Sequence, residues 1–502
     1  MPNPLFDALF APLAGQDRPL LHLAGGQQLT AAAFVALVER LAAALQALGV
    51  APGDRVAAQV AKSPEALALY GATVAVGAVF LPLNTGYTAA EVDYFVGNAT
   101  PRVFVGDPAD AAALDRVCAA HGAQLMGLSA QGTGSLLDLA AQQDAAFAPV
   151  DRAGRDLAAI LYTSGTTGRS KGAMLSHDNL LSNARVLADL WRFTTADVLL
   201  HALPIFHTHG LFVASNVSLL TGGQMVFLPG FDLDAVLAAL PKSTVMMGVP
   251  TFYTRLLDDP RLTRDRVGHM RLFISGSAPL LSETHVAFEA RTGMRILERY
   301  GMTETNMNTS NPYEGDRRAG TVGLPLPGVD LRLMADGLPV AEGEVGVIEV
   351  RGPNVFQGYW QMPDKTAEDL RPDGWFITGD LATRDADGYI TIVGRAKDLV
   401  ITGGLNVYPK EVEEVLDTLP GVAESAVIGL PHPDFGEAVF AILVRAKDAE
   451  PDLAAIRAAV DARLAKFKQP KAYAVIDALP RNTMGKVQKA ALRQAYADRF
   501  KA

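Results

Sequence analysis

The residues whose types best suit chemistry are those at 163–171, directly after an apolar run at 157–162. Glycine leaves backbone N–H groups accessible, hydroxyl side chains add donors, and two cations can neutralise a polyphosphate. A flexible linker explains the segment less well, because linkers seldom follow an apolar strand directly. A Walker A loop is disfavoured, since Lys and then Ser or Thr do not follow the last glycine. We therefore predict a phosphate-binding loop in Thr163-Ser164-Gly165-Thr166-Thr167-Gly168-Arg169-Ser170-Lys171.

Arg299 is the residue most informative about a substrate. In an extended segment its side chain points away from that of Glu298, so the two need not form an ion pair. A buried guanidinium is costly unless an anion meets it, and its planar fork suits a carboxylate. Pairing with a structural carboxylate elsewhere is the alternative interpretation. A small acid with a carboxylate free to meet this arginine, such as the short dicarboxylate malonate, would therefore suit it.

Four further segments combine charged side chains with glycine or hydroxyl groups. Taken singly, each has an ordinary explanation: a solvated carboxylate for Glu304, a turn residue for Asp380, a surface ion pair for Arg395 and a solvated basic tail for Lys486. The segments are Tyr300-Gly301-Met302-Thr303-Glu304, Thr378-Gly379-Asp380, Gly394-Arg395-Ala396-Lys397-Asp398 and Pro480-Arg481-Asn482-Thr483-Met484-Gly485-Lys486.

Length and composition limit the classes of partner. The 502 residues suggest roughly three domains or large subdomains. Lys plus Arg number 44 against 54 Asp plus Glu, a net charge of −10, which argues against nucleic-acid or anionic-membrane binding through bulk charge. Two uncharged stretches, 66–81 and 199–231, contain too many Gly and Pro residues for membrane spans. One cysteine suits a reducing cytoplasm, so we expect a cytoplasmic protein with small-molecule partners.

The elements that must position these residues alternate along the chain. Helix-like segments at 30–51 and 64–76 alternate with strand-like segments at 55–60 and 78–83. This order predicts an α/β fold with layered mixed sheets. We expect a large N-terminal domain at 1–394, with a β-rich subdomain at about 320–394, and a small α+β C-terminal domain at 395–502 on a hinge.

The five motif segments together resemble the signature motifs of the acyl-adenylate-forming enzymes. This superfamily includes acyl-CoA synthetases, luciferases and the adenylation domains of peptide synthetases. The matches occur in the family's order from Tyr162 to Lys486, and the overall sequence pattern resembles that of the family over essentially the whole chain. The resemblance implies that a carboxylate attacks the α-phosphate of ATP with Mg²⁺ present, and that coenzyme A then displaces AMP. The expected products here are malonyl-CoA, AMP and pyrophosphate.

The resemblance also implies roles for individual residues. Lys486 would bridge the carboxylate and the α-phosphate, Thr303 would contact phosphate, Glu304 would hold Mg²⁺, and His207 would lie at the acyl pocket. Arg299, His207 and Ser277 would meet the substrate acid. The implied ATP-binding set is Thr163, Ser164, Gly165, Thr166, Thr167, Gly168, Lys171, Gly276, Ser277, Ala278, Glu298, Tyr300, Gly301, Met302, Thr303, Asp380, Arg395 and Lys486.

Coenzyme A and domain movement receive their own residues by the same resemblance. Lys397 occupies the hinge position about which the small domain turns, and Gly403 and Gly404 would lie near the pantetheine arm. His209 is interpreted as structural. The sequence leaves the oligomeric state open.

Alternative functions remain at this point. A related ligase could activate methylmalonate or another short- to medium-chain acid. An amino acid is disfavoured, because the segment at Phe206-His207 has no Asp to meet an ammonium group. A non-catalytic nucleotide-binding protein with the same fold is the alternative of another class. A hydrolase using Ser277 is the weakest hypothesis, since no Gly-x-Ser-x-Gly elbow surrounds that serine.

Overall fold

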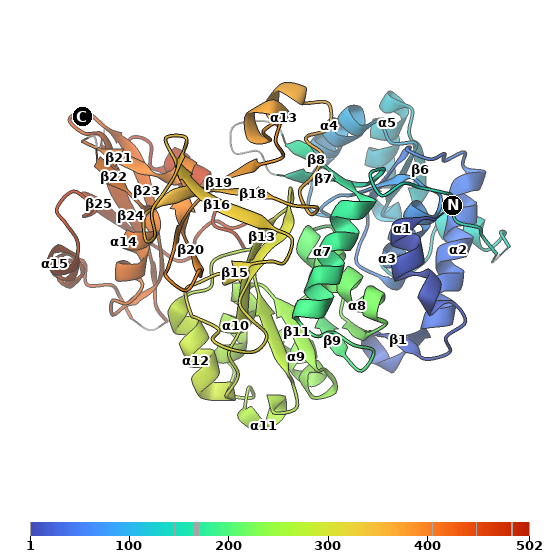
Figure 1. Ribbon diagram of the computed structural model, residues 1–502, viewed down its shortest axis with the longest axis horizontal. Coiled ribbons are helices and arrows are strands. Elements are labelled where there is room, and N and C mark those ends of the chain that lie inside the picture. The colour runs from blue at the N-terminus through green and yellow to red at the C-terminus, as the bar shows by residue number, and fades with distance from the viewer. Residues whose placement is uncertain are drawn as a thin grey trace. The chain divides into compact units, whose positions relative to one another are not determined.

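The computed structural model describes residues 2–144, 146–163, 170–403, 405–447, 449–482 and 485–500 (Figure 1). The chain divides into two compact units. One comprises Met1–Asp330 and Arg351–Phe376, and the other comprises Leu331–Val350 and Ile377–Ala502. The second unit is therefore assembled from two separate stretches of sequence.

A six-stranded sheet of the first unit carries the predicted phosphate loop. The strands run in the order β6-β5-β3-β4-β7-β8. They are parallel from β6 to β7, whereas β8 is antiparallel to β7. The six-residue loop at 164–169 connects β7 to β8 and lies outside the described residues. The bounds are β3 Arg55–Gln59, β4 Val79–Pro82, β5 Val103–Gly106, β6 Gln124–Gly127, β7 Leu157–Thr163 and β8 Lys171–Ser176.

A nine-stranded sheet of the same unit carries the predicted acyl pocket. Its order is β15-β14-β13-β12-β11-β9-β10-β1-β2, and the strands from β13 to β1 are parallel. Their carboxyl ends therefore share one edge, where open α/β sheets bind ligands. The bounds are β1 Pro19–His22, β2 Gln28–Thr30, β9 Val198–His201, β10 Gln224–Phe227, β11 Val245–Gly248, β12 Leu272–Ser275, β13 Leu297–Met302, β14 Asn306–Ser310 and β15 Leu324–Pro325.

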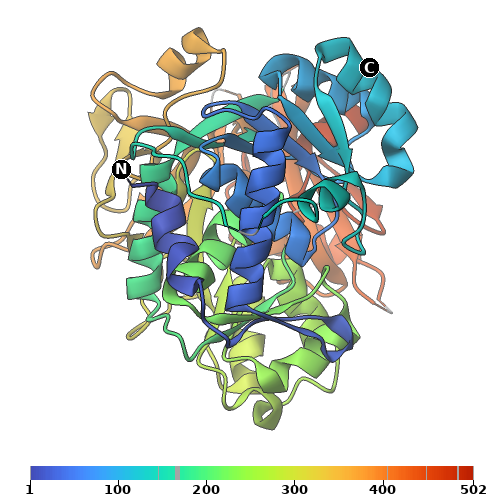
Figure 2. The same cartoon turned by 90° about the vertical axis from the view of Figure 1, so that its right-hand side faces the viewer.

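The helices of the first unit begin where polar side chains can cap them. Thr30 caps α2, and Ser63 caps α3 just before Pro64, a residue suited to the first helical position. Helices α2 and α3 pack together near the N-terminus, where Figure 2 shows α1 and α2 in blue. The bounds are α1 Pro4–Leu9, α2 Ala31–Ala47, α3 Pro64–Ala75, α4 Ala89–Ala99, α5 Ala111–His121, α6 Ser135–Ala140, α7 His177–Leu190, α8 Asn216–Thr221, α9 Leu233–Ala239, α10 Pro250–Leu257, α11 Arg264–Val267, α12 Ser282–Thr292 and α13 Pro363–Asp369.

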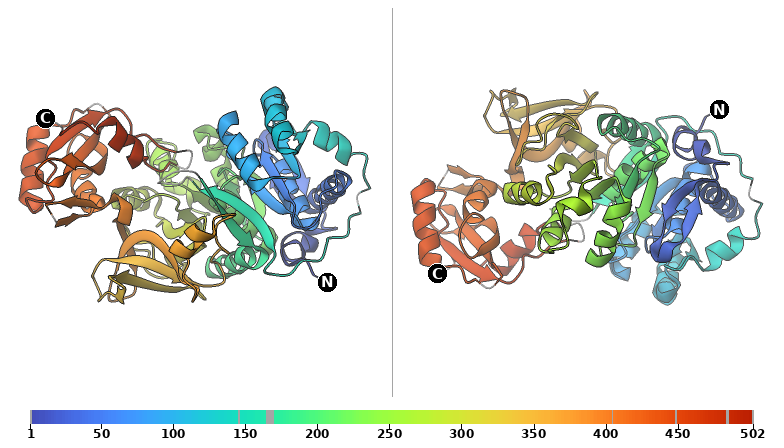
Figure 3. Two further views of the ribbon diagram at one scale, coloured as in Figure 1. Left: turned by 90° about the horizontal axis from the view of Figure 1, so that it is seen from above. Right: turned by 90° about the horizontal axis from the view of Figure 1, so that it is seen from below.

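The second unit contains two sheets. One has the order β17-β16-β18-β19-β20, and the other has the order β22-β21-β24-β23 with β25 paired to β24. Alternation along β23 sends Val427 toward the core shared with α14 and α15, and Ile428 toward the core shared with α16. Figure 3 draws the elements from β23 onward in orange to red. The bounds are β16 Asp330–Ala335, β17 Leu338–Pro339, β18 Gly346–Arg351, β19 Phe376–Arg384, β20 Ile390–Arg395, β21 Val400–Thr402, β22 Leu405–Val407, α14 Pro409–Leu416, β23 Val422–His432, β24 Gly436–Arg445, α15 Leu453–Arg463, β25 Ala472–Ile476 and α16 Lys489–Ala495.

The two uncharged stretches form interior elements of the first unit. Residues 66–81 lie in α3 and β4, and residues 199–231 include β9, a π-helical segment at His209–Ser215, α8 and β10. Within the described ranges, no helix is both long enough and apolar enough to cross a membrane. The mixed α/β architecture agrees with the predicted fold class.

Candidate active site

Three parallel strands bring the acyl-pocket residues together at their carboxyl ends. His201 ends β9 and pairs in register with Met247, while Ser275 ends β12 and pairs with Glu298 of β13. Arg299 is the next residue along β13. Because these strands are parallel, the segments that follow β9 and β12 leave the sheet at the same edge, and β12 is the direct neighbour of the strand that carries Arg299.

Arg299 is buried without a partner for much of its guanidinium group. Its side chain is 3% exposed, and within the described ranges its Nε and Nη2 atoms lack a hydrogen-bond acceptor. Burial lowers the pKa of Arg299 from its ordinary value. Leaving a buried donor unsatisfied costs on the order of 1–3 kcal/mol, more for a charged group. The arrangement therefore favours an incoming anion that can accept hydrogen bonds from this guanidinium.

Glu298 does not supply that anion. Its Oε1 accepts a hydrogen bond from the backbone N–H of Leu280 at 3.2 Å, in the loop that follows β12. Adjacent residues on β13 thus contact different surroundings, as the extended backbone requires. The expectation that Glu298 and Arg299 do not pair agrees with this geometry.

Gly276 and Ser277 form the wall against which Arg299 packs. A Cβ atom at Gly276 would lie 2.4 Å from Cζ of Arg299, so only glycine leaves room for the guanidinium in its present position. Ser277 has φ of +72°, an uncommon backbone conformation for a residue other than glycine. Such conformations cluster at functional sites. The turn after β12 therefore places Gly276 against Arg299 and, at some backbone cost, the Ser277 hydroxyl group next to His209.

His209, which the sequence analysis interpreted as structural, lies closest to this wall. Its Nδ1 is 3.2 Å from Oγ of Ser277, and its Nε2 is a buried atom without a partner in the part of the chain that is described. Burial lowers the pKa of His209, and Arg299 lowers it further. His207 is half-buried, and its Nδ1 accepts the backbone N–H of His209 at 3.3 Å. The site therefore joins Arg299, Ser277 and His209, with His207 beside them.

Glu304 lies in the turn between β13 and β14 and has a defined partner. The carboxylate is buried, and the hydroxyl group of Tyr359 donates to its Oε1 at 3.0 Å. Thr303 precedes it in the same turn, and Thr305 closes the turn through its N–H to the carbonyl of Met302 at 3.2 Å. Tyr300, Gly301 and Met302 form the end of β13. The predicted motif thus occupies one hairpin.

Tyr359 connects this hairpin to the end of the phosphate loop. A β-bridge between Ala173 and Tyr359 places its segment beside β8. Lys171, the first residue of β8, has its Nζ 4.1 Å from the centroid of the Tyr359 ring and 3.4 Å from Oδ2 of Asp369. Burial raises the pKa of Tyr359, and Glu304 and Asp369 act in the same direction. Lys171 and Glu304 are therefore linked through one tyrosine.

The remaining loop residues are placed only in part. Thr163 pairs with Lys171 across β7 and β8, and its hydroxyl group donates to the Lys171 carbonyl oxygen at 3.4 Å. The backbone positions on either side of the loop are thus adjacent. The predicted residues Ser164, Gly165, Thr166, Thr167 and Gly168 lie outside the described residues, as does Gly404.

In the second unit, Asp380 and Arg395 face each other across antiparallel strands. They pair in register on β19 and β20, and Arg395 Nε lies 2.8 Å from Asp380 Oδ1. Asp380 is buried, and the preceding Gly379 has φ of +72°, a conformation that glycine adopts readily. This geometry holds a carboxylate at a fixed position beside a guanidinium.

Lys397 and Lys486 also belong to the second unit. Partial burial lowers the pKa of Lys397 to about 8, and the positive charges of Arg395, Lys486 and Arg493 act in the same direction. Lys486 is exposed, and its backbone N–H donates to Oδ1 of Asn482 at 2.9 Å. Gly403 has φ of +58°, and its N–H donates to the carbonyl of Phe435 at 2.9 Å.

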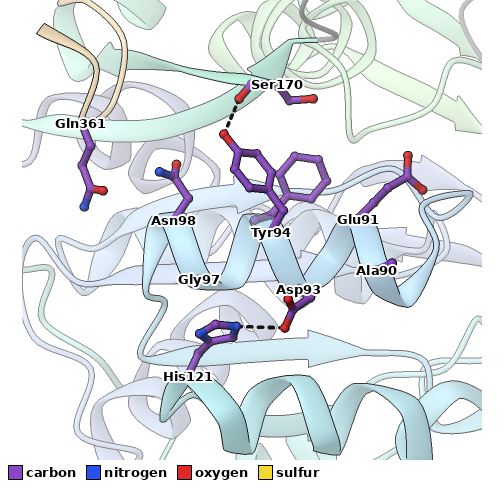
Figure 4. A pocket seen from close by; sticks show the side chains of 10 residues that line it. Ala90, Glu91, Asp93, Tyr94, Gly97, Asn98, His121, Ser170 and Gln361 are labelled. Atoms are coloured by element: carbon purple, nitrogen blue, oxygen red, sulfur yellow. Dashed lines mark hydrogen bonds and ion pairs between the residues drawn. The ribbon is translucent and has the colours of Figure 1, made fainter. Parts of the chain in front are cut away.

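A separate groove lies beside α4, with a volume of about 690 Å³. Figure 4 shows Tyr94 donating to the carbonyl of Ser170, and His121 paired with Asp93 on its opposite side. Among the described residues that line it, Ser170 belongs to the predicted phosphate loop, and the others are not predicted site residues. Two carboxylates, those of Glu91 and Asp93, lie at the groove, so it is poorly suited to a polyphosphate.

Family models match both units of this chain. A model described as AMP-binding enzyme matches residues 12–360, and one described as AMP-binding enzyme C-terminal domain matches residues 411–486. The chain therefore belongs to the AMP-binding enzyme family.

Individual relatives narrow the class. The crystal structure of ATP-bound MatB from Rhodopseudomonas palustris is 57% identical, with a TM-score of 0.98 and coverage of 100% of each chain. A feruloyl-CoA synthase from an Amycolatopsis species is 37% identical over 94% of this chain and 95% of that protein. A malonate–CoA ligase from Arabidopsis thaliana is 34% identical over 90% of this chain and 80% of that protein. These relationships confirm the predicted class, an AMP-forming acid–CoA ligase, whose substrates include ATP and coenzyme A.

Two features of the site were missing from the sequence prediction. Tyr359 was not identified, because nothing in the local sequence indicates that its hydroxyl group reaches Glu304, 55 positions earlier in the chain. The proximity of His209 to Arg299 was also missed. A usable signal existed, since three histidines, His201, His207 and His209, fall in a stretch without any formal charge.

Proposed function

We propose that this chain is a malonate–CoA ligase, which forms malonyl-AMP from malonate and ATP and then transfers the malonyl group to coenzyme A. The observation that carries the substrate assignment is the buried, incompletely satisfied guanidinium of Arg299 beside Ser277 and His209. The relationships to MatB and to malonate–CoA ligases support it. The feruloyl-CoA synthase, at 37% identity, is about as similar in sequence as the malonate–CoA ligase from Arabidopsis thaliana at 34%, so the pocket residues have to decide the acid.

In the first step one malonate carboxylate attacks the α-phosphorus of ATP. A new O–P bond forms, the bond between the α- and β-phosphates breaks, and pyrophosphate leaves. Arg299 binds the second carboxylate through charged hydrogen bonds, and Ser277 adds a hydroxyl donor. Lys486 bridges the attacking carboxylate and the α-phosphate, which lowers the repulsion between two anions. Holding the distal carboxylate fixes where the reacting carboxylate lies.

The resemblance to the family assigns nucleotide contacts to residues within each unit. Asp380 accepts hydrogen bonds from the ribose hydroxyl groups, as acidic residues do in other nucleotide sites. Arg395, paired with Asp380 at 2.8 Å, orients that carboxylate and contacts the nucleotide. Thr163, Lys171 and the loop between them hold the phosphates, and Thr303 contacts the α-phosphate. The segment Gly276-Ser277-Ala278 lies on the adenine side.

Mg²⁺ would be held by Glu304 together with the phosphates of ATP. A buried carboxylate oriented by Tyr359 fits this role, because Mg²⁺ is usually bound by one or two carboxylates plus substrate phosphates. In the described ranges, no cluster of three or more His, Cys, Asp or Glu side chains could hold a metal ion by itself. When bound, the ion neutralises phosphate charge during displacement.

In the second step the thiol of coenzyme A attacks the malonyl carbonyl carbon. A C–S bond forms, the C–O bond to AMP breaks, and the thiol proton is released. Gly403 and Gly404 leave space for the pantetheine arm. Lys397 is the hinge about which the residues from 395 onward turn between the two steps, a form of conformational gating. A cytoplasmic location and an N-terminal domain ending at 394 stay predictions.

Acid-dependent exchange of pyrophosphate into ATP tests the proposal. Purified protein with Mg²⁺ is supplied with malonate, methylmalonate, acetate, octanoate or an amino acid. Malonate should stimulate exchange most, and addition of coenzyme A should then yield malonyl-CoA by mass spectrometry. Exchange stimulated chiefly by octanoate or an amino acid would keep the class and reject malonate. Exchange with none of these acids would favour a non-catalytic nucleotide-binding protein.

A further inference from the structure

Lys62 is a half-buried lysine that contacts His201, the last residue of β9. It lies between β3 and the N-cap of α3, and burial lowers the pKa of its ammonium group well below the ordinary value. Nζ is 2.7 Å from the His201 carbonyl oxygen, 2.9 Å from His201 Nδ1 and 4.3 Å from the centroid of the Phe227 ring. Within the ranges that the structure describes, no carboxylate forms an ion pair with it.

The ammonium group fixes the tautomer of His201. An ammonium has donors only, so Nδ1 of His201 must accept and Nε2 must carry the proton. Nε2 lies 2.9 Å from the carbonyl oxygen of Gly210 and 3.1 Å from Oγ of Ser215. Ser215 also donates to the Gly210 carbonyl oxygen at 2.9 Å. His201 is thus a buried neutral imidazole that donates toward the π-helical segment.

The π-helical segment begins at His209, whose pKa the charge of Arg299 helps to lower. Gly210 follows His209, and a Cβ atom at Gly210 would lie 1.9 Å from the carbonyl oxygen of Pro204, so the turn is tightly packed. π-Helical turns occur frequently at functional sites. A continuous set of contacts runs from Lys62 through His201 to Gly210, and the next side chain, His209, contacts Ser277.

We propose that Lys62 and His201 are positioning residues that determine specificity for a dianionic acid. Their hydrogen bonds hold the turn at Gly210, so that His209 keeps its contact with Ser277, the residue after the Gly276 against which Arg299 packs. Neither residue touches the substrate. This inference rests on the proposed function and goes beyond it, because it assigns selectivity to residues outside the pocket.

The test compares acids of different charge in wild-type protein and in Lys62→Met. Methionine keeps the length of the side chain but removes its charge and its donors. We expect the KM for malonate to rise about 10-fold, the effect of losing one charged hydrogen-bond donor. The KM for ATP and the exchange driven by acetate should stay within about 2-fold of wild type. Lys242→Met, at an exposed lysine, is the matched control and should change neither acid.

His201 variants provide a second readout that a merely structural role would not give. The amide of glutamine reaches the position of Nε2, whereas that of asparagine reaches the position of Nδ1. His201→Gln should keep the malonate KM within about 3-fold of wild type, and His201→Asn should resemble Lys62→Met. If Lys62→Met does not fold, this pair decides the question.

The outcomes are separable. An unchanged preference for malonate over acetate in folded Lys62→Met, or equal effects of His201→Gln and His201→Asn, would overturn the inference. Wild-type protein that exchanges with another acid but not with malonate would overturn the proposed function instead.

Discussion

The phosphate side and the acyl side of this site treat their charges differently. On the phosphate side, Lys171 lies near Asp369 and Glu304 accepts a hydrogen bond from Tyr359. On the acyl side, Arg299 is buried with two guanidinium nitrogen atoms for which the described residues provide no acceptor. Charges that already have protein partners can be held in place without a ligand. A charge without one favours whichever ligand supplies it, and we therefore propose that the first side serves catalysis and the second side selects the acid.

The largest effect is expected at Lys486, which tests whether chemistry and selection are separate. Lys486→Ala removes the cation proposed to bridge the two reacting anions. Adenylation should fall about 1000-fold, since losing one group that stabilises developing charge typically costs 100- to 1000-fold. The loss should be equal for malonate and acetate in pyrophosphate exchange. Lys466→Ala, at an exposed lysine of the same unit, controls for loss of charge alone, and unchanged exchange in Lys486→Ala would contradict the assignment.

Arg299→Met should give the next largest effect and should change selectivity. Removing one partner of a buried ion pair costs about 2–5 kcal/mol, so kcat/KM for malonate should fall at least about 30-fold. Acetate has no second carboxylate, so its activation should be nearly unchanged or improved. Steady-state kinetics with both acids measure this. A parallel loss for the two acids would show that Arg299 supports the fold and does not choose the acid.

Gly276→Ala should disturb the same guanidinium without removing its charge. The added Cβ atom would lie 2.4 Å from Cζ of Arg299, so the side chain has to move. We expect the KM for malonate to rise about 10-fold, with a smaller change in the KM for ATP. Gly230→Ala is a suitable control, because a Cβ atom there has no neighbour within 4 Å. Wild-type kinetics in Gly276→Ala would argue that the guanidinium position is not critical.

Tyr359→Phe should give the smallest effect and should act on the phosphate side alone. The substitution removes the donor to Glu304 but keeps the ring beside Lys171. Loss of a hydrogen bond to a charged group should lower kcat about 10-fold or less and raise the Mg²⁺ concentration needed for half-maximal rate. The preference for malonate over acetate should not change. A changed preference would contradict the separation of the two sides.

The sequence predicted the parts of the site that depend on local pattern. The strand at β7, the extended segment around Arg299 and the α/β order follow from apolar runs and alternation. The family motifs identified Glu304 and Lys486. What could be read from sequence was therefore residue type and local conformation, and the divergence of Glu298 and Arg299 followed from both.

The parts that depend on distant contacts could not be predicted. Tyr359 meets Glu304 because a β-bridge to Ala173 brings its segment beside β8, and no local pattern encodes that pairing. Lys62 reaches His201, which lies 139 positions later in the chain. The two residues follow β3 and end β9, strands of different sheets, so no local pattern indicates the contact. The composition of the second unit was also not evident, since residues 331–350 join it from a separate stretch of sequence.

The central claim is that Arg299 selects the acid through the charge of a second carboxylate. Comparing malonate with its monomethyl ester in wild-type protein tests this most directly, because the ester keeps one reactive carboxylate and removes the other charge. The account predicts that malonate is preferred at least about 30-fold in kcat/KM for pyrophosphate exchange. Equal activation of the half-ester would contradict it.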